Sequence, residues 1–378
     1  MSALPFSHNL YLSLGSNMGD RFGHLQTAVN WLFEEVGSIV KISSVYETPA
    51  MGFDGDAFLN CAIWMRSDLE PSKIMDSILK IEKSMGRKRD QSKTYASRPI
   101  DIDILLIDQL ILETEKLTVP HPRIASRKFV LQPLYDIDSG VTHPVFNKDI
   151  AELLVETEDK SALQKQSKWL LNPMKEFNIS QFNYIAIEGN IGAGKTSLAS
   201  KIARDFNAKL ILERFKDNPF LPKFYEDPTR YAFPLEMSFL ADRYQQLVDD
   251  ITQFNLFKDS VISDYDLHKS LIFAKITLTE VEFSLYRRLY SLMYKELPRP
   301  DLYVYLYQDT DRLLENIKKR GREYEQGIEA AYLQRVNAGY LEFIKTQPVG
   351  NIKIVDISEM EFLKERGDYL KILRTIFE

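Results

Sequence analysis

The sequence predicts two domains, a ferredoxin-like α+β domain followed by an α/β domain built on a parallel sheet. The chain has 378 residues, whereas one domain usually takes roughly 100–200. Up to residue 108, runs typical of strands and helices follow in the order strand, helix, strand, strand, helix, strand. Beyond about residue 180, short apolar runs alternate with long helical segments, which indicates parallel strands covered on both faces.

Six elements account for the first domain. The strands are predicted from apolar or alternating runs bounded by turn formers, and the helices from apolar residues at helical spacing. Pro71 and Gly86 frame the second helix, as expected from the preferences of helix ends. In chain order the elements are strand 10–14, helix 21–37, strand 39–49, strand 58–67, helix 71–86 and strand 99–108.

A change of composition marks the boundary between the domains. Residues 148–171 are predicted to be a polar helix or tail, and residues 172–181 contain turn formers without periodicity. We therefore expect a first domain over 1–168, a linker over 169–181 and a second domain over 182–378.

The second domain is predicted from short apolar strands that are separated by helical segments. In such sheets, ligands bind at the carboxyl ends of the strands. The predicted strands are 184–190, 208–215, 260–266, 301–308 and 351–358.

Composition excludes several classes of protein. Apolar residues make up 44% and charged residues 27%, and the net charge is −6, so bulk electrostatics favour neither nucleic acid nor an anionic membrane as a partner. Cys61 is the single cysteine and cannot form an intramolecular disulfide. The N-terminus does not read as a signal peptide, and no apolar run has the length of a membrane span. We expect a cytoplasmic protein.

A glycine-rich loop in the second domain predicts a phosphate-binding site. It matches G-x-x-x-x-G-K-[ST], follows a predicted strand and precedes a predicted helix. In this motif, backbone N–H groups surround phosphate oxygens, the lysine adds a positive charge and the last hydroxyl can ligate Mg²⁺. The domain is therefore expected to be an α/β P-loop kinase. The residues predicted to bind ATP are Gly189, Asn190, Ile191, Gly192, Ala193, Gly194, Lys195 and Thr196.

Two further features suit phosphoryl transfer. Glu213 ends the predicted strand 208–215, where a carboxylate faces the ligand crevice and can accept a proton from an attacking hydroxyl. Arg320 and Arg322 belong to a basic run around Gly321, which suits a lid that closes on phosphoryl oxygens. The alternative interpretations are a solvated loop glutamate and a solvated basic helix end.

Together these segments resemble the deoxynucleoside kinase family, especially the bacterial deoxyadenosine/deoxyguanosine kinases. The resemblance rests on "EGNIGAGKTSLA", "LERFKDNPFLPKFYEDPTRYAFPLEMSFLADRYQQL", "ISDYDLHKSLIFA" and "KKRGREYEQGI". It implies phosphorylation of a nucleoside 5′-hydroxyl by ATP, with Glu213 as the base, and a homodimer formed through a helix face. It also implies nucleoside contacts: Tyr225 and Glu325 near the sugar 3′-hydroxyl, Arg243 beside the base and Phe233 packed on the base.

The chain departs from this family at two places. Asp264, Tyr265 and Asp266 stand where the family usually has D/E-R-S, so the arginine is missing, although Asp264 can still hold one Mg²⁺ through water. Glu236 stands where the family commonly reads the base with glutamine. A carboxylate only accepts hydrogen bonds, which favours the donor-rich edge of guanine unless Glu236 is protonated or water mediates. The resemblance leans towards deoxyadenosine. We expect a purine deoxynucleoside, with deoxyadenosine slightly ahead.

The first domain has its densest chemistry at "RPIDIDILLID". Asp101 and Asp103 are two apart on a predicted strand, so both side chains point to one face. Two Mg²⁺ ions would relieve the repulsion between them. Basic residues flank the pair on both sides and can bind polyphosphate oxygens. The alternative interpretation is a charged edge strand that discourages aggregation.

This domain resembles 6-hydroxymethyl-7,8-dihydropterin pyrophosphokinase, an enzyme of folate synthesis. The resemblance rests on "LSLGSNMGDR", "SSVYETPAMG", "FLNCAI", "IEKSMGRKR", "RPIDIDIL" and "VPHPRIASRKFVLQPL". It implies transfer of diphosphate from ATP to the pterin hydroxymethyl group. The implied ATP contacts are Glu82, Arg87, Arg89, Arg98, His121 and Arg127. The implied pterin contacts are Thr48, Pro49, Met51, Phe58, Asn60, Phe129 and Tyr95, where the family often has tryptophan.

The sequence thus predicts a bifunctional enzyme whose two reactions share ATP and Mg²⁺ but no intermediate. Two alternatives concern the second domain, which could be a pyrimidine nucleoside kinase or a non-catalytic nucleotide-binding regulatory module. A third idea is that the fusion mainly drives assembly.

Overall fold

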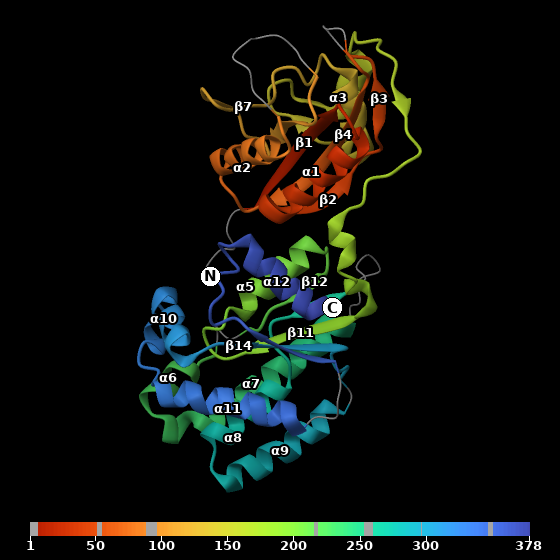
Figure 1. Ribbon diagram of the computed structural model, residues 1–378. Helices are drawn as coiled ribbons and strands as arrows, with labels where there is room; N and C mark the ends of the chain where they lie inside the picture. The colour runs from red at the N-terminus through yellow and green to blue at the C-terminus, as the bar shows by residue number, and fades with distance from the viewer. Residues whose placement is uncertain are drawn as a thin grey trace. The chain divides into compact units, whose positions relative to one another are not determined.

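The computed structural model describes residues 7–50, 55–87, 97–214, 218–252, 260–295, 297–346 and 351–378. The chain divides into two compact units, Pro5–Phe177 and Asn178–Glu378, which Figure 1 shows in ribbon form. Each unit has its own sheet and its own core, so we describe each by itself.

The first unit is built on an antiparallel sheet centred on β1. Cys61 of β4 lies opposite Leu14 of β1 and is 1% exposed, and burial raises the pKa of its thiol to about 12. The predicted strand 39–49 is two strands, because Ser43 between them takes part in two hydrogen bonds with the Ala62 backbone. The strands are β1 (His8–Ser16), β2 (Ser38–Ile42), β3 (Tyr46–Thr48), β4 (Phe58–Ser67), β5 (Asp101–Ile107) and β10 (Gln164–Lys165), with spatial order β10-β3-β4-β1-β5 and β2 also on β4.

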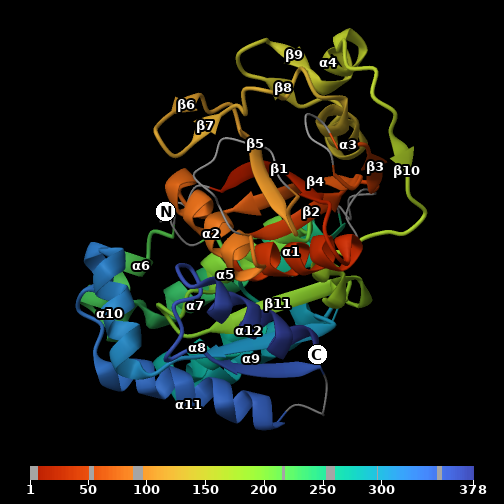
Figure 2. The same ribbon diagram turned by 45° about the horizontal axis from the view of Figure 1, so that its top comes forward.

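Helices cover both faces of this sheet (Figure 2). Alternate residues of β1 point to opposite faces, so Leu10, Leu12 and Leu14 lie on one face and Tyr11 on the other. Tyr11 packs in a cluster with α3 (Lys128–Asp138), whereas α1 (Arg21–Glu35) and α2 (Pro71–Ser84) lie on the opposite face. This is the expected ferredoxin-like arrangement. The remaining elements are β6 (Leu112–Glu113), β7 (Thr118–Val119), β8 (Thr142–His143), β9 (Lys148–Asp149) and α4 (Ile150–Glu156).

The segment that leaves the first unit packs on it up to Phe177. β10 pairs with β3, and the Asn172 side chain donates to the Ile39 carbonyl oxygen at 3.1 Å. The short helix η1 (Pro173–Glu176) follows, and the ring of Phe177 lies 6.3 Å from that of Phe33. The second unit begins just before the short helix η2 (Ile179–Gln181).

The second unit is built on a parallel sheet with the order β12-β13-β11-β14-β15. The strand that leads into the glycine loop is central, so the loop lies where strand order reverses, which is the usual ligand-binding point of such sheets. Its strands are β11 (Tyr184–Gly189), β12 (Lys209–Ile211), β13 (Val261–Ser263), β14 (Leu302–Tyr307) and β15 (Ile352–Asp356).

Helices cover both faces of the parallel sheet, as Figure 1 shows. A tyrosine-rich core joins Tyr184, Tyr303 and Tyr305 of the sheet to the helices below it in that view. Those helices are α7 (Pro228–Thr252), α8 (His268–Thr277), α9 (Glu280–Tyr294) and α11 (Ala330–Thr346). The other helices are α5 (Lys195–Asp205) and α12 (Arg366–Phe377) on the opposite face, and α6 (Leu221–Glu226), α10 (Thr310–Arg320) and the short η3 (Glu323–Glu325). Among the described residues, no helix combines the length and apolar character that crossing a bilayer requires.

Candidate active sites

The glycine loop of the second unit lies between β11 and α5. Gly192 and Gly194 have φ values of +85° and +81°, a left-handed conformation that favours glycine. At Gly189, a Cβ atom would come within 2.7 Å of the Leu306 carbonyl oxygen, so the backbone can pass close to β14 only without a side chain. The Lys195 ammonium donates to the Asn190 carbonyl oxygen at 2.9 Å. These contacts hold the loop against the sheet edge.

Thr196 and Asp264 lie together beside this loop. The Thr196 hydroxyl donates to Asp264 Oδ2, and Asp264 Oδ1 accepts from the backbone N–H of Glu213 at 2.7 Å. Burial raises the pKa of the Asp264 carboxyl. A hydroxyl and a carboxylate at a phosphate-binding loop are hard oxygen donors, so the pair fits a Mg²⁺ ion that keeps most of its water and phosphate ligands.

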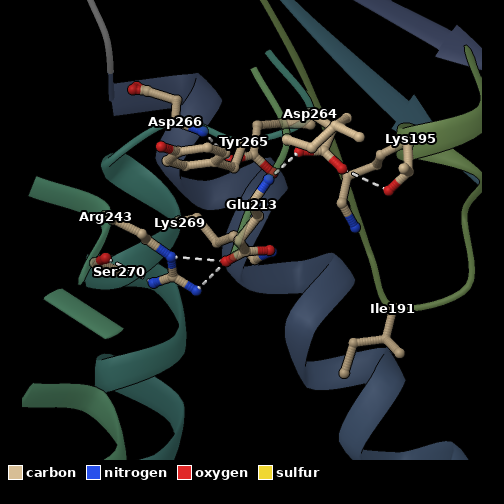
Figure 3. A network of polar contacts seen from close by, with 12 residues as sticks. Ile191, Lys195, Glu213, Arg243, Asp264, Tyr265, Asp266, Lys269 and Ser270 are labelled. Carbon is tan, nitrogen blue, oxygen red and sulfur yellow. Dashed lines mark hydrogen bonds and ion pairs between the residues drawn. The ribbon is translucent and has the colours of Figure 1, made fainter. Parts of the chain in front are cut away.

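Glu213 is the centre of a charged network (Figure 3). Its Oε1 accepts from Arg243 Nε at 2.8 Å and Nη2 at 2.7 Å, and its Oε2 accepts from Lys269 Nζ at 2.6 Å. Arg243 also donates from Nη1 to Ser270 Oγ at 2.7 Å. Burial alone would raise the pKa of the Glu213 carboxyl, but Lys269 and Arg243 outweigh it and hold that pKa far below its usual range. Glu213 is therefore ionised and held in one orientation.

Lys269 brings a second positive charge to Glu213. The side chain of Tyr265 is fully buried in the tyrosine-rich core, whereas Lys269, four residues later in the first turn of α8, reaches Glu213. Burial and the charge of Lys269 together lower the pKa of Lys195 to about 8. Sequence reasoning missed Lys269, because only the path of α8 brings it to the site.

A pocket extends from the glycine loop between the helices. Arg320 and Arg322 line it and both pair with Glu325, Arg322 Nη1 lying 3.0 Å from Glu325 Oε1. The ring of Tyr225 stacks on that of Tyr324 at 5.9 Å. The lining residues are Ile191, Lys195, Thr196, Glu213, Leu221, Phe224, Tyr225, Leu235, Glu236, Phe239, Arg243, Asp264, Lys269, Phe273, Arg320, Arg322, Glu325 and Tyr332.

Glu236 lines this pocket as a carboxylate that is 3% exposed. Its Oε1 lies 3.2 Å from Thr277 Oγ1, and its Oε2 has no hydrogen-bond partner among the described residues. Burial raises the pKa of the Glu236 carboxyl to about 7, against the lowering effect of Arg243 and Thr277. The carboxyl group therefore keeps one buried oxygen without a hydrogen-bond partner among the described residues.

Two residues differ from what the resemblance implied. Phe233 is not among the described residues that line the pocket; it lies off the face of α7 formed by Leu235 and Phe239, which are one turn apart. The lining phenylalanines are instead Phe224, Phe239 and Phe273. Arg243 lines the pocket, but its three nitrogens bond to Glu213 and Ser270. It therefore acts on Glu213 rather than having its donors directed at a base.

In the first unit, strand register aligns the candidate residues in one row. Asp101 of β5 lies opposite Gly15 of β1, and Gly15 lies opposite Asn60 of β4. Asp103 lies opposite Ser13 in the next row on the same face. The predicted pair of carboxylates therefore lies on one face, as expected, and shares that face with Asn60.

Two arginines hold the first of these carboxylates. Arg87 donates to Asp101 and to Glu82, and Arg98 Nη2 lies 2.8 Å from Asp101 Oδ2. Glu82 is 1% exposed and also accepts from the Ile102 backbone N–H at 2.9 Å. Glu82 therefore lies behind Arg87 and orients it, while the guanidinium groups of Arg87 and Arg98 are nearer to the open face.

The charges of this site fit divalent cations. Burial, together with the negative charge of Asp101, raises the pKa of the Asp103 carboxyl to about 6. Two crowded carboxylates of this kind are what a pair of Mg²⁺ ions would neutralise. Burial and the charges of Arg127 and Arg123 lower the pKa of His121 to about 4, so this imidazole is neutral at neutral pH. A neutral imidazole can donate one hydrogen bond and accept another.

Two of the residues implied for the pterin, Thr48 and Phe58, lie beside Asn60. Asn60 donates to Thr48 Oγ1 at 2.8 Å, and both side chains are buried. The guanidinium of Arg98 lies 5.7 Å from the Phe58 ring, and that of Arg127 lies 5.4 Å from the Phe129 ring. Pro49 follows Thr48 directly at the end of β3. Met51, Arg89 and Tyr95 lie outside the described residues.

Comparison with known proteins gives a separate result for each unit. The model for "Deoxynucleoside kinase" matches residues 185–378, and the model for "7,8-dihydro-6-hydroxymethylpterin-pyrophosphokinase (HPPK)" matches residues 11–139. Deoxyguanosine kinase of Bacillus subtilis is 37% identical over 199 residues, which make up 52% of this chain and 96% of that protein. Deoxyadenosine/deoxycytidine kinase of the same organism is 31% identical over 196 residues, covering 48% and 88%. 2-Amino-4-hydroxy-6-hydroxymethyldihydropteridine pyrophosphokinase of Aquifex aeolicus is 41% identical over 144 residues, covering 38% and 88%.

Proposed function

Because this chain belongs to the 7,8-dihydro-6-hydroxymethylpterin-pyrophosphokinase family over its N-terminal part and to the deoxynucleoside kinase family over its C-terminal half, we propose a specific reaction for each unit. Membership of these families makes the chain an ATP-dependent pyrophosphokinase and an ATP-dependent deoxynucleoside kinase. The first unit transfers diphosphate from ATP to the hydroxymethyl group of 6-hydroxymethyl-7,8-dihydropterin and leaves AMP. The second unit transfers a phosphoryl group from ATP to the 5′-hydroxyl of a purine deoxynucleoside.

In the kinase unit, positive groups converge on the transferred phosphoryl group. The glycine loop and Lys195 bind the ATP phosphates, and Thr196 and Asp264 hold one Mg²⁺, which supplies charge neutralisation when bound. Arg320 and Arg322 lie on the opposite wall of the pocket and are paired with Glu325. Glu325 and Tyr225 bind the 3′-hydroxyl of the sugar. When the sugar binds to Glu325, it weakens the ion pairs of Glu325 with Arg320 and Arg322, which can then turn towards phosphate.

Glu213 receives the 5′-hydroxyl. Its low pKa makes it a weak proton acceptor, but the transition state of phosphoryl transfer is loose and demands little early loss of the hydroxyl proton. The fixed carboxylate therefore acts first by orienting the hydroxyl oxygen in line with the phosphorus, and takes the proton late. The observation that carries this role is the pair of cations on its two oxygens.

The choice of base turns on Glu236. The sequence places deoxyadenosine slightly ahead, whereas an ionised Glu236 suits the adjacent donors of guanine. The relatives named above include both a deoxyguanosine kinase and a deoxyadenosine/deoxycytidine kinase. We therefore propose a purine deoxynucleoside and keep both purines as substrates. Deoxycytidine is the second candidate, favoured only by the name of the second relative.

A product assay tests the kinase proposal. The purified chain is given Mg²⁺ and ATP with each deoxynucleoside in turn, and ADP and the nucleoside monophosphate are measured. We expect turnover of deoxyguanosine and deoxyadenosine that exceeds that of deoxycytidine and thymidine. Preferential turnover of a pyrimidine would overturn the purine assignment, and ATP binding without any turnover would support the non-catalytic alternative.

In the first unit, Asp101 and Asp103 are proposed to hold two Mg²⁺ ions that neutralise the ATP phosphates. Arg87, Arg98 and Arg127 bind the phosphate oxygens, for which forked guanidinium groups are well suited. Asn60 and Thr48 read the polar edge of the pterin, and Phe58 and Phe129 stack against the flat ring. The observation that carries this assignment is the shared sheet face of Asp101, Asp103 and Asn60.

We further propose that the chain forms a homodimer through the kinase unit in the cytoplasm. Val281, Leu285 and Leu292 of α9 are 82%, 46% and 68% exposed, and their spacing puts them on one face of the helix. An exposed apolar stripe of this kind is typical of a surface that a second copy covers.

A further inference from the structure

Glu236 is a buried acid that forms no ion pair with a cation among the described residues. The cation of the same helix that acts on it, Arg243, lies two turns later and has its guanidinium nitrogens directed at Glu213 and Ser270. The cation of α8, Lys269, is likewise bonded to Glu213. No ion pair therefore holds the Glu236 carboxyl group in its ionised form, and both the ionised and the protonated form are accessible to it.

The surroundings of Glu236 suit a flat base. Thr277 touches its Oε1, and one turn earlier on α8 lies Phe273; on α7, Phe239 follows Glu236 by one turn. Both rings line the same pocket as Glu236. A nucleobase that packs on these aromatic side chains would have its hydrogen-bonding edge beside the carboxyl group of Glu236, whose buried Oε2 lacks a partner among the described residues.

The hydroxyl of Thr277 can form a hydrogen bond with either the ionised or the protonated carboxyl group of Glu236. It lies 2.9 Å from the Phe273 carbonyl oxygen as well as 3.2 Å from Glu236 Oε1. Its single proton can therefore go to the carbonyl or to the carboxylate, and its oxygen can accept from a protonated carboxyl. No donor among the described residues bonds to Oε2, so a proton can occupy that oxygen without losing a hydrogen bond.

The two forms of the acid differ in the purines that they match. An ionised carboxylate offers two acceptors, which match the adjacent N1–H and 2-amino donors of guanine. A protonated carboxyl offers one donor and one acceptor, which match an acceptor ring nitrogen and the 6-amino donor of adenine, as a glutamine amide would. The protonated form also fits the O6 acceptor and N1–H donor of guanine, whereas the ionised form does not fit adenine, because it has no donor for the ring nitrogen.

We infer that Glu236 selects between deoxyguanosine and deoxyadenosine through its own protonation, so that one site accepts both purines in proportions set by pH. This inference rests on the proposed purine kinase function and deepens it. Deoxyadenosine needs the protonated form, whereas deoxyguanosine can use both, so the ratio of kcat/KM for deoxyguanosine to that for deoxyadenosine rises as the acid ionises. Once the ionised form dominates, this ratio rises about tenfold for each pH unit.

The charged and titratable groups around Glu236 place its titration near neutral pH. Arg243 of α7 and Lys269 of α8 favour the ionised form, while the ionised Glu213 and burial oppose it. Tyr286 of α9 and Tyr332 of α11 face it as neutral phenols, whose pKa values are raised by burial and, in part, by the Glu236 charge. The ionised fraction of Glu236 therefore increases as pH rises through about 7.

Internal competition tests this inference. Equal concentrations of the two purines are mixed with Mg²⁺ and ATP from about pH 6 to about pH 8, where the acid titrates, and the ratio of dGMP to dAMP is measured. The ratio cancels the pH dependence of ATP, Lys195 and Glu213, because both substrates share them. We expect the logarithm of the ratio to rise with pH for the full chain, towards a slope of one where the ionised form dominates, and a flat ratio for Glu236→Gln.

The outcomes separate the two proposals. A flat ratio in the unaltered chain, or an unchanged slope in Glu236→Gln, overturns the inference while purine turnover still stands. An absence of purine turnover at every pH overturns the proposed function as well. The control Glu342→Gln removes a carboxylate from the exposed side of α11, paired with Lys275, and should leave the slope unchanged.

Calorimetry gives a readout that does not depend on the variant or on catalysis. Each purine deoxynucleoside is titrated into the full chain near pH 7 in buffers of different ionisation enthalpy, which reports the protons exchanged on binding. Deoxyadenosine should take up protons, whereas deoxyguanosine should not. Proton uptake with both purines, or with neither, overturns the inference.

Discussion

At the residue scale, the ion pairs of Glu213 distinguish this kinase site. The carboxylate bonds to Arg243 with one oxygen and to Lys269 with the other. Tyr265 is buried in the core, whereas Lys269 of α8, four residues later, reaches the site.

A substitution of Lys269 tests this contact. In Lys269→Met, loss of a cation raises the pKa of Glu213 and frees its orientation, so kcat should fall about 10²-fold and the acid limb of the pH–rate profile should move to higher pH. Lys269→Arg keeps the charge and should recover much of both. A fall in kcat with an unmoved acid limb would show that Lys269 serves the fold alone.

Motifs identified some site residues from the sequence, and packing determined the rest. Lys195, Thr196, Asp101 and Asp103 are predictable because each lies within a short segment whose spacing fixes its geometry. The ring of Phe239 and the contact of Lys269 depend on how α7 and α8 cross, which no local spacing encodes. Phe233 was misassigned to the pocket wall for the same reason.

At the scale of elements, most strands and helices follow the predicted order. The predicted strand 39–49 is interrupted by a serine that pairs with β4, and the pairing of β10 with β3 was not foreseen because two residues carry no periodicity. The linker was predicted over 169–181, but residues 169–177 belong to the first unit and pack on it through isolated apolar residues.

The outer face of α9 gives a prediction at this scale. Leu292→Glu adds a charge to the exposed apolar stripe and should convert a dimer into a monomer, because burying an unpaired carboxylate is costly. Sedimentation velocity measures the change, and far-UV circular dichroism should remain unaltered. Arg287→Glu, an exposed charge change on the same helix outside the apolar stripe, serves as the matched control. A monomeric unaltered chain would contradict the dimer proposal directly.

At the scale of the whole molecule, the described residues of each candidate site belong to one unit. Asp101 and Asp103 stand on the sheet of the first unit, and the glycine loop on that of the second. Family membership over separate stretches agrees with this division. The two reactions therefore need no shared residue.

Reciprocal substitutions test this independence. Asp101→Ala should reduce AMP formation with the pterin at least about 10³-fold and leave nucleoside phosphorylation unchanged, because it removes a proposed metal ligand. Lys195→Ala should do the reverse. Both activities are measured in the same preparation, so each serves as the folding control for the other. Loss of both activities in either variant would contradict separate sites.

The single thiol of the chain, Cys61, can report how often the first unit opens. It lies in the middle of β4 with 1% of its surface exposed, and burial raises its pKa to about 12, so an alkylating reagent reaches it only when the first sheet opens. The rate of alkylation of Cys61 therefore measures opening of the first unit and does not depend on opening of the kinase unit. A pterin and a nucleotide bound together to the first unit should lower this rate, and a deoxynucleoside should leave it unchanged.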